Sequence, residues 1–426
     1  MKGMKKKVLA FAAAAVLMAP QMVGAEGFAI YEWSAEGMGM AGARMFAEND
    51  AANLAYNPAS ITKVKGEAFK VSATYMSPHG KYETKGVPAI PGVTPGSPDS
   101  SGHNRVHPAW APGMYYVKQI NEKEWFGMGT WSRFGMVSQF ERDSIPGSNS
   151  FSAKLNGLTL GANYAHKFDK KWTASLGAEV NYVGLQMDKN MMGGMPIHIE
   201  GESYALGWNA ATNYEFDEKN EIGLVYRSAI NHSMDADYDF HPPLPGLLGN
   251  QYGDAYACVT LPESLTLGYN HKFNDKTRVE LNYIWTRWER YDALNISFNP
   301  GLSVPSLSPQ PIPGKDYAKN WTNGKRFAIG LEHKFSDKYS GMLGYAFDHS
   351  NIPFDGGDFM IPTGTRTTYS IGAQYHDKKQ TLAVSLGWMN VGSLDFRGEP
   401  PYDTFTKAHT RDSYTKMASI SYQRNF

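Results

Sequence analysis

The sequence predicts an antiparallel β-barrel of fourteen strands that spans the outer membrane of a Gram-negative bacterium. Three observations lead to this fold class: an N-terminal export signal, a two-residue alternation of apolar and polar side chains, and a regular alternation of short and long connections. The 426 residues have a mean hydropathy of −0.44 and contain only one long apolar run, at 8–18. A helical membrane bundle needs several apolar runs of about 20 residues, so this class is excluded.

Residues 1–25 have the organisation of a cleaved signal peptide. Four lysines precede the apolar run at 8–18, which is too short to span a bilayer as a helix, and Val23-Gly24-Ala25 supplies small residues. We expect cleavage after Ala25; a retained anchor is the alternative. Cleavage leaves 37 basic and 41 acidic side chains, a net charge of −4 (37 − 41). This balance gives no indication of a nucleic-acid partner, and the single Cys258 excludes an internal disulfide.

Apolar and aromatic side chains alternate with small or polar ones along most of residues 67–426. In 264–273, for example, Leu265, Leu267 and Phe273 fall in one row, and Thr266 and Asn270 fall in the other. Successive side chains of a strand point to opposite faces, so this pattern predicts strands with one apolar face. The pattern alone does not distinguish a soluble sandwich from a barrel whose apolar face meets lipid.

The connections distinguish these two architectures. Short charged turns alternate with long stretches rich in proline and glycine. The six short turns are at 121–124, 169–171, 217–220, 274–276, 336–338 and 377–379, and the seven long ones at 81–103, 139–150, 188–199, 239–255, 295–316, 352–364 and 395–410. Thirteen connections (6 + 7) join fourteen strands. Short periplasmic turns and long external loops are typical of an outer-membrane barrel, and closure leaves no open sheet edge.

The two ends of the mature chain carry further signals. The last strand alternates and stops at Phe426, which resembles the signal that the outer-membrane assembly machinery recognises. Residues 26–66 lack strand alternation; Ser34 suits the N-cap of a short helix, and 50–56 a second helix ended by Asn57-Pro58. This segment is poor in lysine and arginine, which argues against a flexible tail. We therefore predict a mostly helical hatch at 26–66 inside a barrel formed by 67–426.

Several short motifs resemble the outer-membrane long-chain fatty acid transporter family (FadL/TodX type) over essentially the whole mature chain. The motifs are Gly27-Phe28, Gly37-Met38-Gly39, Asp50-Ala51-Ala52-Asn53, the hatch motif Asn57-Pro58-Ala59, Leu261-Pro262-Glu263, Arg326-Phe327-Ala328-Ile329-Gly330, and Gly344-Tyr345-Ala346-Phe347-Asp348 followed by Pro353. The resemblance implies a fourteen-stranded barrel plugged by an N-terminal hatch. It also implies that external loops capture an apolar substrate, which passes to a pocket beside the N-terminal tail and leaves through the wall at a kinked third strand.

Candidate residues for these steps follow from the resemblance and from side-chain chemistry. Methionine and leucine in external loops suit varied apolar shapes, unless the loops merely cover one another. An arginine in the lumen suits a substrate carboxylate, although pairing with Glu179, Glu280 or Glu332 is the structural alternative. Glycine often marks a bend in a strand. The candidates for substrate contact are Phe28, Ile30, Met191, Met192, Met195, Leu244, Leu247, Leu248, Arg133 and Arg326, and those for the strand kink are Gly127 and Gly129.

The predicted function is transport of hydrophobic molecules, such as fatty acids or aromatic hydrocarbons, across the outer membrane. The alternative is a general porin or an adhesin, and a barrel enzyme ranks third. The chain lacks the Gly-x-Ser-x-Gly and His-Glu-x-x-His motifs, and its twelve histidines show no metal spacing, so we expect no enzyme, cofactor or metal. The expected partners are the ligand, outer-membrane lipid and lipopolysaccharide, and the assembly machinery; the resemblance implies a monomer.

Overall fold

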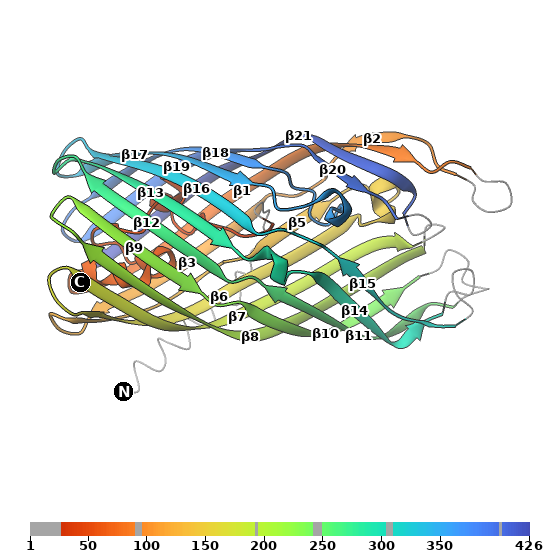
Figure 1. Ribbon diagram of the computed structural model, residues 1–426, viewed down its shortest axis with the longest axis horizontal. Helices are drawn as coiled ribbons and strands as arrows, with labels where there is room; N and C mark the ends of the chain where they lie inside the picture. The colour runs from red at the N-terminus through yellow and green to blue at the C-terminus, as the bar shows by residue number, and fades with distance from the viewer. Residues whose placement is uncertain (1–26, 90–95, 192–194, 242–248, 304–309, 400–402) are drawn as a thin grey trace.

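All strands form one antiparallel sheet that closes on itself (Figure 1). The computed structural model describes residues 27–89, 96–191, 195–241, 249–303, 310–399 and 403–426, so the predicted signal peptide lies outside the described residues. The sheet closes because the first strand, β1 (Glu67–Gly86), pairs with the last, β21 (Phe405–Asn425). The fold class is therefore the predicted closed barrel.

The sheet has fourteen crossings, which confirms the strand number. Seven crossings are continuous and seven are split into two segments. The continuous strands are β1, β6 (Ser152–Lys167), β7 (Trp172–Met191), β8 (Met195–Glu215), β17 (Tyr339–His349), β18 (Arg366–His376) and β21. The split crossings are β2 (Ser100–His103) with β3 (Ala109–Gln119), β4 (Glu124–Trp131) with β5 (Gly135–Gln139), β9 (Asn220–Arg227) with β10 (Ile230–Phe240), β11 (Gln251–Leu261) with β12 (Ser264–Lys272), β13 (Thr277–Thr286) with β14 (Ala293–Leu302), β15 (Ile312–Ala318) with β16 (Gly324–Lys334), and β19 (Gln380–Val391) with β20 (Leu394–Arg397).

The apolar row of each strand faces outward. Leu206, Leu267 and Leu386 are 79%, 48% and 63% exposed, whereas Asn270 and Glu280 of the opposite rows are buried. Large apolar side chains would be unfavourable on a surface that meets water, so this wall suits a hydrocarbon environment. Within the described residues, no helix has both the length and the apolar character needed to cross a membrane.

The strands extend further than their sequence pattern indicated. β7 and β8 continue into the stretch predicted as a long loop, and Met191 and Met195 are directly opposite each other in their ladder. These two residues are therefore paired strand ends and not loop residues, because neighbouring strands continue to exchange backbone hydrogen bonds beyond the apolar zone. Two short 3₁₀ helices lie in connections at this end of the barrel, η2 (Ile145–Ser148) and η4 (Phe354–Gly356). A third, η3 (Trp288–Arg290), lies within the split crossing between β13 and β14.

The segment before β1 fills the bore at the end that also carries the C-terminus (Figure 1). It contains α2 (Ala35–Gly39), α3 (Asn53–Tyr56) and the 3₁₀ helix η1 (Pro58–Lys63). Ser34 caps α2, since its Oγ accepts a 3.0 Å hydrogen bond from Gly37 N, and α3 ends at Tyr56, directly before Asn57-Pro58. Both predicted helices are present, and turns connect them in a compact hatch.

The Asn-Pro-Ala motif fixes the hatch to the inner wall. Asn57 Oδ1 accepts a hydrogen bond from Ala59 N, and Asn57 Nδ2 donates to Asn213 Oδ1 of β8 at 2.6 Å. Pro58 occupies the first turn of η1, where the missing N–H is not needed. Ala59 is fully buried against Met45, Phe46 and the wall. The motif therefore joins a helix start to the barrel.

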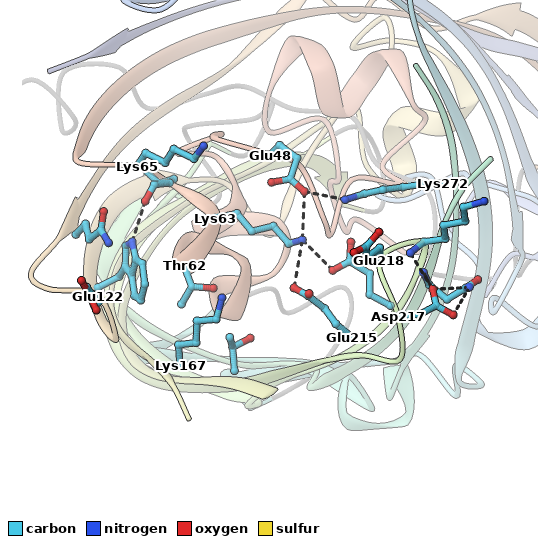
Figure 2. A pocket seen from close by; sticks show the side chains of 17 residues that line it. Glu48, Thr62, Lys63, Lys65, Glu122, Lys167, Glu215, Asp217, Glu218 and Lys272 are labelled. Atoms are coloured by element: carbon cyan, nitrogen blue, oxygen red, sulfur yellow. Dashed lines mark hydrogen bonds and ion pairs between the residues drawn. The ribbon is translucent and has the colours of Figure 1, made fainter. Parts of the chain in front are cut away.

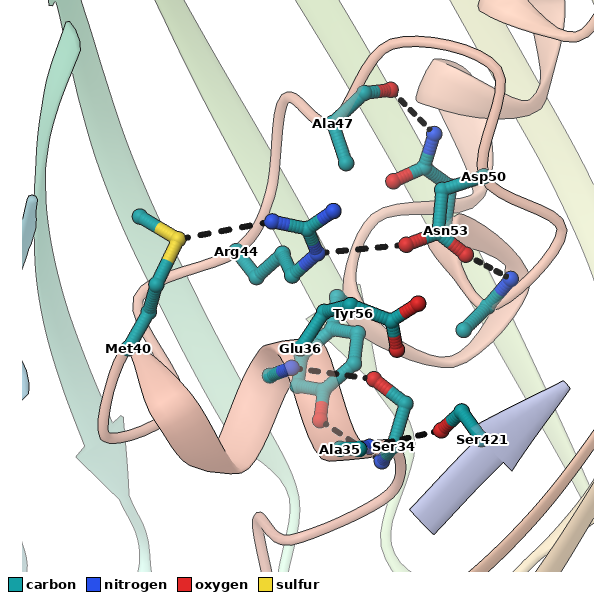
Figure 3. A network of polar contacts seen from close by, with 12 residues as sticks. Ser34, Ala35, Glu36, Met40, Arg44, Ala47, Asp50, Asn53, Tyr56 and Ser421 are labelled. Carbon is teal, nitrogen blue, oxygen red and sulfur yellow. Dashed lines mark hydrogen bonds and ion pairs between the residues drawn. The ribbon is translucent and has the colours of Figure 1, made fainter. Parts of the chain in front are cut away.

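Buried ion pairs hold the hatch to the inner wall of the barrel. Lys70 of β1 lies 2.8 Å from Glu36 and 2.7 Å from Asp50, and within the hatch Arg44 bonds Asp50 at 3.1 Å (Figure 3). Burial alone would raise the pKa of the Asp50 carboxyl, but the charges of Lys70 and Arg44 outweigh burial and hold this pKa below its usual value. Asp50 thus remains a carboxylate that two cations share.

The same chain of charges continues into the wall. Arg44 reaches Glu332, which pairs with Arg278 at 2.7 Å, and Arg278 pairs with Glu280 at 3.0 Å. Glu280 also accepts hydrogen bonds from the backbone N–H groups of Met45 and Phe46. We call this set the floor network; its members are Glu36, Arg44, Asp50, Lys70, Arg278, Glu280 and Glu332.

Below the hatch, the bore opens as a charged cavity of about 490 Å³ (Figure 2). Lys63 of η1 lies 2.9 Å from Glu221 and 3.5 Å from Glu48, and Lys272 of β12 lies 3.2 Å from the same Glu48. This mouth is polar and communicates with the short turns. The surroundings of the hatch are therefore charged on the periplasmic side.

Candidate functional site

The barrel wall has an interruption in its third crossing, between β4 and β5. Trp131 pairs with Thr159 of β6 and Gly135 pairs with Asn156. Gly135 lies four residues after Trp131, whereas Asn156 lies only three residues before Thr159 in β6. The β4–β5 side therefore has one extra residue, which forms a bulge within 132–134. β5 then pairs only with β6 among the described strands, and the outer part of β3 pairs only with β1. The wall therefore contains a gap between β3 and β5.

The sequence of β3 favours this gap. Pro112 lies in the part of β3 that faces β5, and proline has no N–H group to donate to a neighbouring strand. Gly127 and Gly129, the predicted kink residues, lie instead in the regular ladder of β4, opposite Val117 and Tyr115 of β3. The interruption at 132–134 thus lies beyond both glycines. A bulge needs an extra residue in one strand and does not require glycine, so counting glycines placed it incorrectly.

The first described residues, 27–33, close the gap from the inside. Ile30 N donates to Arg133 O at 2.9 Å, and Gly135 N donates to Phe28 O at 2.9 Å, so the tail forms a short antiparallel bridge with the interrupted strand. Trp33 Nε1 donates to Ser132 O at 2.6 Å. Trp33 O accepts from Ser72 Oγ of β1 and Tyr115 OH of β3. The tail thus satisfies backbone groups that the neighbouring strand leaves unpaired.

Phe28 anchors this tail in a cage of four aromatic rings. Its ring is fully buried and meets each neighbour edge-on, the geometry that aromatic pairs prefer. The centroid distances are 6.0 Å to Phe134, 4.8 Å to Trp288, 5.3 Å to Tyr291 and 6.3 Å to Trp321. Ile30 packs separately, against methionines of the hatch and wall. Both predicted tail residues are therefore buried apolar contacts beside the gap.

Two arginines and one glutamate lie next to the tail. Arg133 Nη1 donates to Glu179 Oε2 at 2.9 Å, and Arg227 pairs with the other oxygen, Oε1. Arg133 also reaches Ser228 O at 3.4 Å, and Arg227 donates to the carbonyl oxygens of Leu54 and Ala55 in α3. The side chains of all three charged residues are at most 5% exposed, and their formal charges sum to +1 (2 − 1). This trio links the gap to the hatch and has a surplus positive charge.

A small cavity of about 40 Å³ lies between the tail and this trio. Its lining combines Ile30, Tyr31 and Phe134 with both arginines and with hydroxyl and amide side chains of β12 and β13. Among these, Thr286 Oγ1 and Asn282 Oδ1 are buried without a protein hydrogen-bond partner. A buried polar atom without a partner is unfavourable unless a ligand or water satisfies it. The cavity therefore offers apolar and polar contacts side by side.

Arg326 and Arg133 are in different environments. Arg326 lies 3.0 Å from Asp348, donates to Ala41 O of the hatch at 2.9 Å, and stacks over the Tyr31 ring at 4.6 Å. Its charge is matched by a carboxylate of its own. Of the three glutamates named as structural alternatives, Glu179 is the one that pairs with Arg133, and Arg227 shares it. The structure thus brings Phe28, Ile30 and Arg133 to one place and gives Arg326 a separate role in holding the hatch.

The loop candidates lie elsewhere. Met192, Leu244, Leu247 and Leu248 lie outside the described residues. Phe426 follows the last strand, β21, and its N–H donates to Glu67 O at the start of β1 at 2.8 Å. Its role in assembly remains a prediction.

Sequence reasoning missed several residues of the site. Arg227 and Lys70 lie in the inward, polar rows of their strands, so a charge in that row was the signal for both. Trp288, Tyr291 and Trp321 gave no such signal, because they lie in or beside irregular segments between split strands. Their convergence on Phe28 depends on the barrel as a whole.

Comparison with known proteins agrees with this architecture. The family described as "Outer membrane protein transport protein (OMPP1/FadL/TodX)" matches residues 16–393. The long-chain fatty acid transport protein of Escherichia coli (strain K12) is 24% identical over 438 residues, covering 92% of this chain and 94% of that protein. Outer membrane protein P1 of Haemophilus influenzae (strain ATCC 51907 / DSM 11121 / KW20 / Rd) is 26% identical, covering 90% of each chain.

Solved structures share the fold. A Pseudomonas aeruginosa FadL homologue superposes with a TM-score of 0.80 at 17% identity, covering 94% of this chain and 100% of that one. The Pseudomonas putida toluene transporter TodX superposes with a TM-score of 0.69 at 16% identity, covering 93% and 99%. The family match spans most of the chain, and the structure is a closed barrel of fourteen strands with a hatch. The chain therefore belongs to the OMPP1/FadL/TodX family of outer-membrane transport proteins.

Proposed function

We propose that this protein carries hydrophobic molecules of the long-chain fatty acid type from the cell surface into the outer membrane, and that the cargo leaves sideways through the gap between β3 and β5. The named relatives support the cargo class, since those from Escherichia coli and Salmonella typhi are long-chain fatty acid transport proteins. The observation that carries the proposal is the interrupted third crossing, whose unpaired edge is closed by only two backbone hydrogen bonds with the N-terminal tail.

The polarity of the bore supports a sideways route. Above the hatch, one buried apolar cluster runs from Phe28 through Trp288 to Phe359 and the outer strand ends. Below it, the floor network and the charged mouth occupy the path to the periplasm. An alkyl chain loses its hydrophobic stabilisation when it enters a charged, hydrated passage. The wall gap offers an exit from one apolar environment into another.

The trio of Arg133, Glu179 and Arg227 supports an anionic head group on the cargo. A carboxylate placed in the adjacent cavity would balance the surplus positive charge and accept charge-assisted hydrogen bonds. Arg133 also belongs to the interrupted strand and bonds the tail through its backbone. Binding of a head group at Arg133 would therefore act directly on the contact that closes the gap.

Deletion of Ser132 tests the exit route. Removing one residue equalises the step count of β4–β5 with that of β6, so the strand can run straight and pair with β3. We expect a folded barrel whose uptake of radiolabelled oleate by whole cells falls to the level of cells without the protein. Uptake that equals the wild-type level would contradict the lateral route.

Ser132→Ala is the matched control. This substitution keeps the extra residue and the Ser132 carbonyl that accepts from Trp33 Nε1, and it removes only a buried hydroxyl that has no hydrogen-bond partner among the described residues. The variant should retain uptake at the wild-type level. A loss equal to that of the Ser132 deletion would mean that the serine side chain, and not the extra residue, is what uptake requires.

A further inference from the structure

The connection between β17 and β18 turns into the bore. It covers residues 350–365 and includes η4, and it lies at the end of the barrel that has the long connections. Loops usually lie on the surface, where water satisfies their backbone. Here Ile352, Phe359, Met360 and Ile361 are all buried, and Phe359 is completely inaccessible. The buried part of this connection therefore behaves as a core element.

Phe359 lies in its own cage of four aromatic rings. The centroid distances are 5.7 Å to Tyr82, 5.1 Å to Phe140, 4.9 Å to Phe396 and 5.5 Å to Phe405, and all four contacts are edge-on. These rings come from β1, from the end of β5, from β20 and from β21. Rings from four different strands or strand ends thus surround Phe359 of the β17–β18 connection, just as four rings surround Phe28.

The connection is held by polar contacts on both sides of Phe359. Asp358 forms an ion pair with Lys319, whose side chain is 1% exposed, and Asp358 Oδ1 accepts from the N–H groups of Met360 and Ile361. Phe359 N donates to Asn149 Oδ1 at 2.9 Å, and Ser138 Oγ of β5 donates to Phe359 O at 2.6 Å. We call the Lys319–Asp358 pair the latch. The apolar ring therefore depends on a small number of polar bonds for its position.

The cage lies beside the unpaired edge of β5. A cavity of about 70 Å³ is lined by Tyr82 and Phe140 of the cage, by residues 136–138 of β5, and by Met360. Ligand pockets are usually roughly 300–1,000 Å³, so this space does not admit an alkyl chain while Phe359 is present. Removal of the Phe359 ring would join the cage to this cavity along the unpaired edge of β5. The tail closes the same edge at 133–135.

We propose that the cage of Tyr82, Phe140, Phe396 and Phe405 is a binding site for the hydrocarbon part of the cargo, and that Phe359 occupies this site until cargo displaces it. The inference rests on the proposed function and adds a second closing element above the tail. An alkyl or aryl group in the cage replaces the apolar contacts that Phe359 gives up, so the exchange leaves no empty apolar space. Opening then requires the latch to separate and the connection to withdraw.

The test measures equilibrium binding of radiolabelled oleate, and of toluene as a second probe, to the purified full-length barrel in detergent. A site that its own side chain occupies shows an affinity reduced by the fraction of time it is free. Phe359→Ala empties the cage and Asp358→Asn weakens the latch. We expect both variants to bind oleate about tenfold more tightly than the wild type.

Two controls make the test specific. Phe46→Ala removes a fully buried ring of the hatch that belongs to a separate apolar cluster, and it should leave the affinity for oleate unchanged. Lys319→Met removes the other half of the latch while Asp358 keeps its bonds to Met360 N and Ile361 N, and it should tighten the binding of oleate to the same extent as Asp358→Asn. Far-UV circular dichroism checks that each variant is a folded barrel.

The outcomes separate the two proposals. Variants that bind oleate no more tightly than the wild type, or a gain of equal size in Phe46→Ala, would overturn the cage proposal alone. Unchanged affinity in Lys319→Met would also overturn it, because the latch would not control the site. A wild-type barrel that binds neither oleate nor toluene would overturn both the cage and the proposed function.

Discussion

The two halves of the bore are closed by different kinds of contact. The upper half is closed by aromatic rings, with Phe28 and Phe359 each set among four others. The lower half is closed by charges, with Lys70, Arg44 and Arg278 joined through four carboxylates. An apolar molecule can replace a ring without a penalty, but it cannot replace an ion. The upper half is thus suited to exchange with cargo and the lower half to permanent closure.

The largest expected effect comes from removing the central cation of the floor network. In Lys70→Met, Glu36 and Asp50 are left as buried carboxylates that lack this partner. Breaking a buried pair by removing one member costs about 3–5 kcal/mol. We expect the hatch amides at 35–56 to lose protection by this amount in hydrogen exchange measured by mass spectrometry.

Lys85→Met is the matched control, because Lys85 pairs with Asp99 on an exposed part of β1. Hatch protection in this variant should match the wild type. Equal protection in Lys70→Met would mean that the lower half is held by shape and not by charge.

The next effect is expected in the upper half. Phe28→Ala empties one aromatic cage and should weaken closure of the tail by about 3 kcal/mol, near the lower end for buried phenylalanine because the four rings can relax inward. The amides of Ile30 and Gly135, which form the two bonds of the tail bridge, should then exchange faster, while those of α2 keep their protection. Simultaneous loss of protection in α2 would show that the two halves open as one unit.

The barrel was predictable because its signals are local. Alternation needs only neighbouring residues such as Leu265, Thr266 and Leu267, and the charged turns occur at regular intervals. The Asn-Pro-Ala motif and the Ser34 cap are equally local. The position of the kink was not predictable in this way, because the extra residue at 132–134 is visible only by comparison with the partner strand β6.

The site depends on contacts that are distant in sequence. Arg133, Glu179 and Arg227 come from three crossings, and the sequence alone suggested Glu179 as a partner without indicating that two arginines share it. Phe28 could be identified from the family resemblance, whereas its cage of Trp288, Tyr291 and Trp321 could not. Loop residues such as Leu244 lie outside the described residues, so their predicted role in capture stays a prediction.

A third effect is expected at Arg133, a charged residue beside the tail in the upper, aromatic half of the bore. Arg133→Met removes one of the two guanidinium groups beside the tail cavity and should weaken binding of oleate by about 1.5 kcal/mol, the contribution of a hydrogen bond to a charged group. Binding of oleyl alcohol, which has the same chain and no charge, should change far less. Equal losses for both ligands, measured by equilibrium binding in detergent, would show that Arg133 acts through packing.

The smallest effect is expected at the periplasmic mouth. Lys272→Ala removes a partly exposed pair with Glu48, and such pairs contribute about 0.5 kcal/mol or less in salt-containing solution. Hatch protection and oleate uptake should both remain at the wild-type level. A clear loss of hatch protection would show that the ion pairs of the periplasmic mouth, and not only the floor network, hold the hatch in place.

The seam between β1 and β21 has a consequence for biogenesis. The hatch donates from Ala35 N to Ser421 Oγ and from Ala51 N to Gln423 Oε1, and it accepts from Gln423 Nε2 at Asn49 O. All three bonds depend on the final strand, which is synthesised last. The hatch residues nearest the start of the described chain are therefore secured by side chains of its last strand, so we expect this docking to follow the formation of β21 in the barrel.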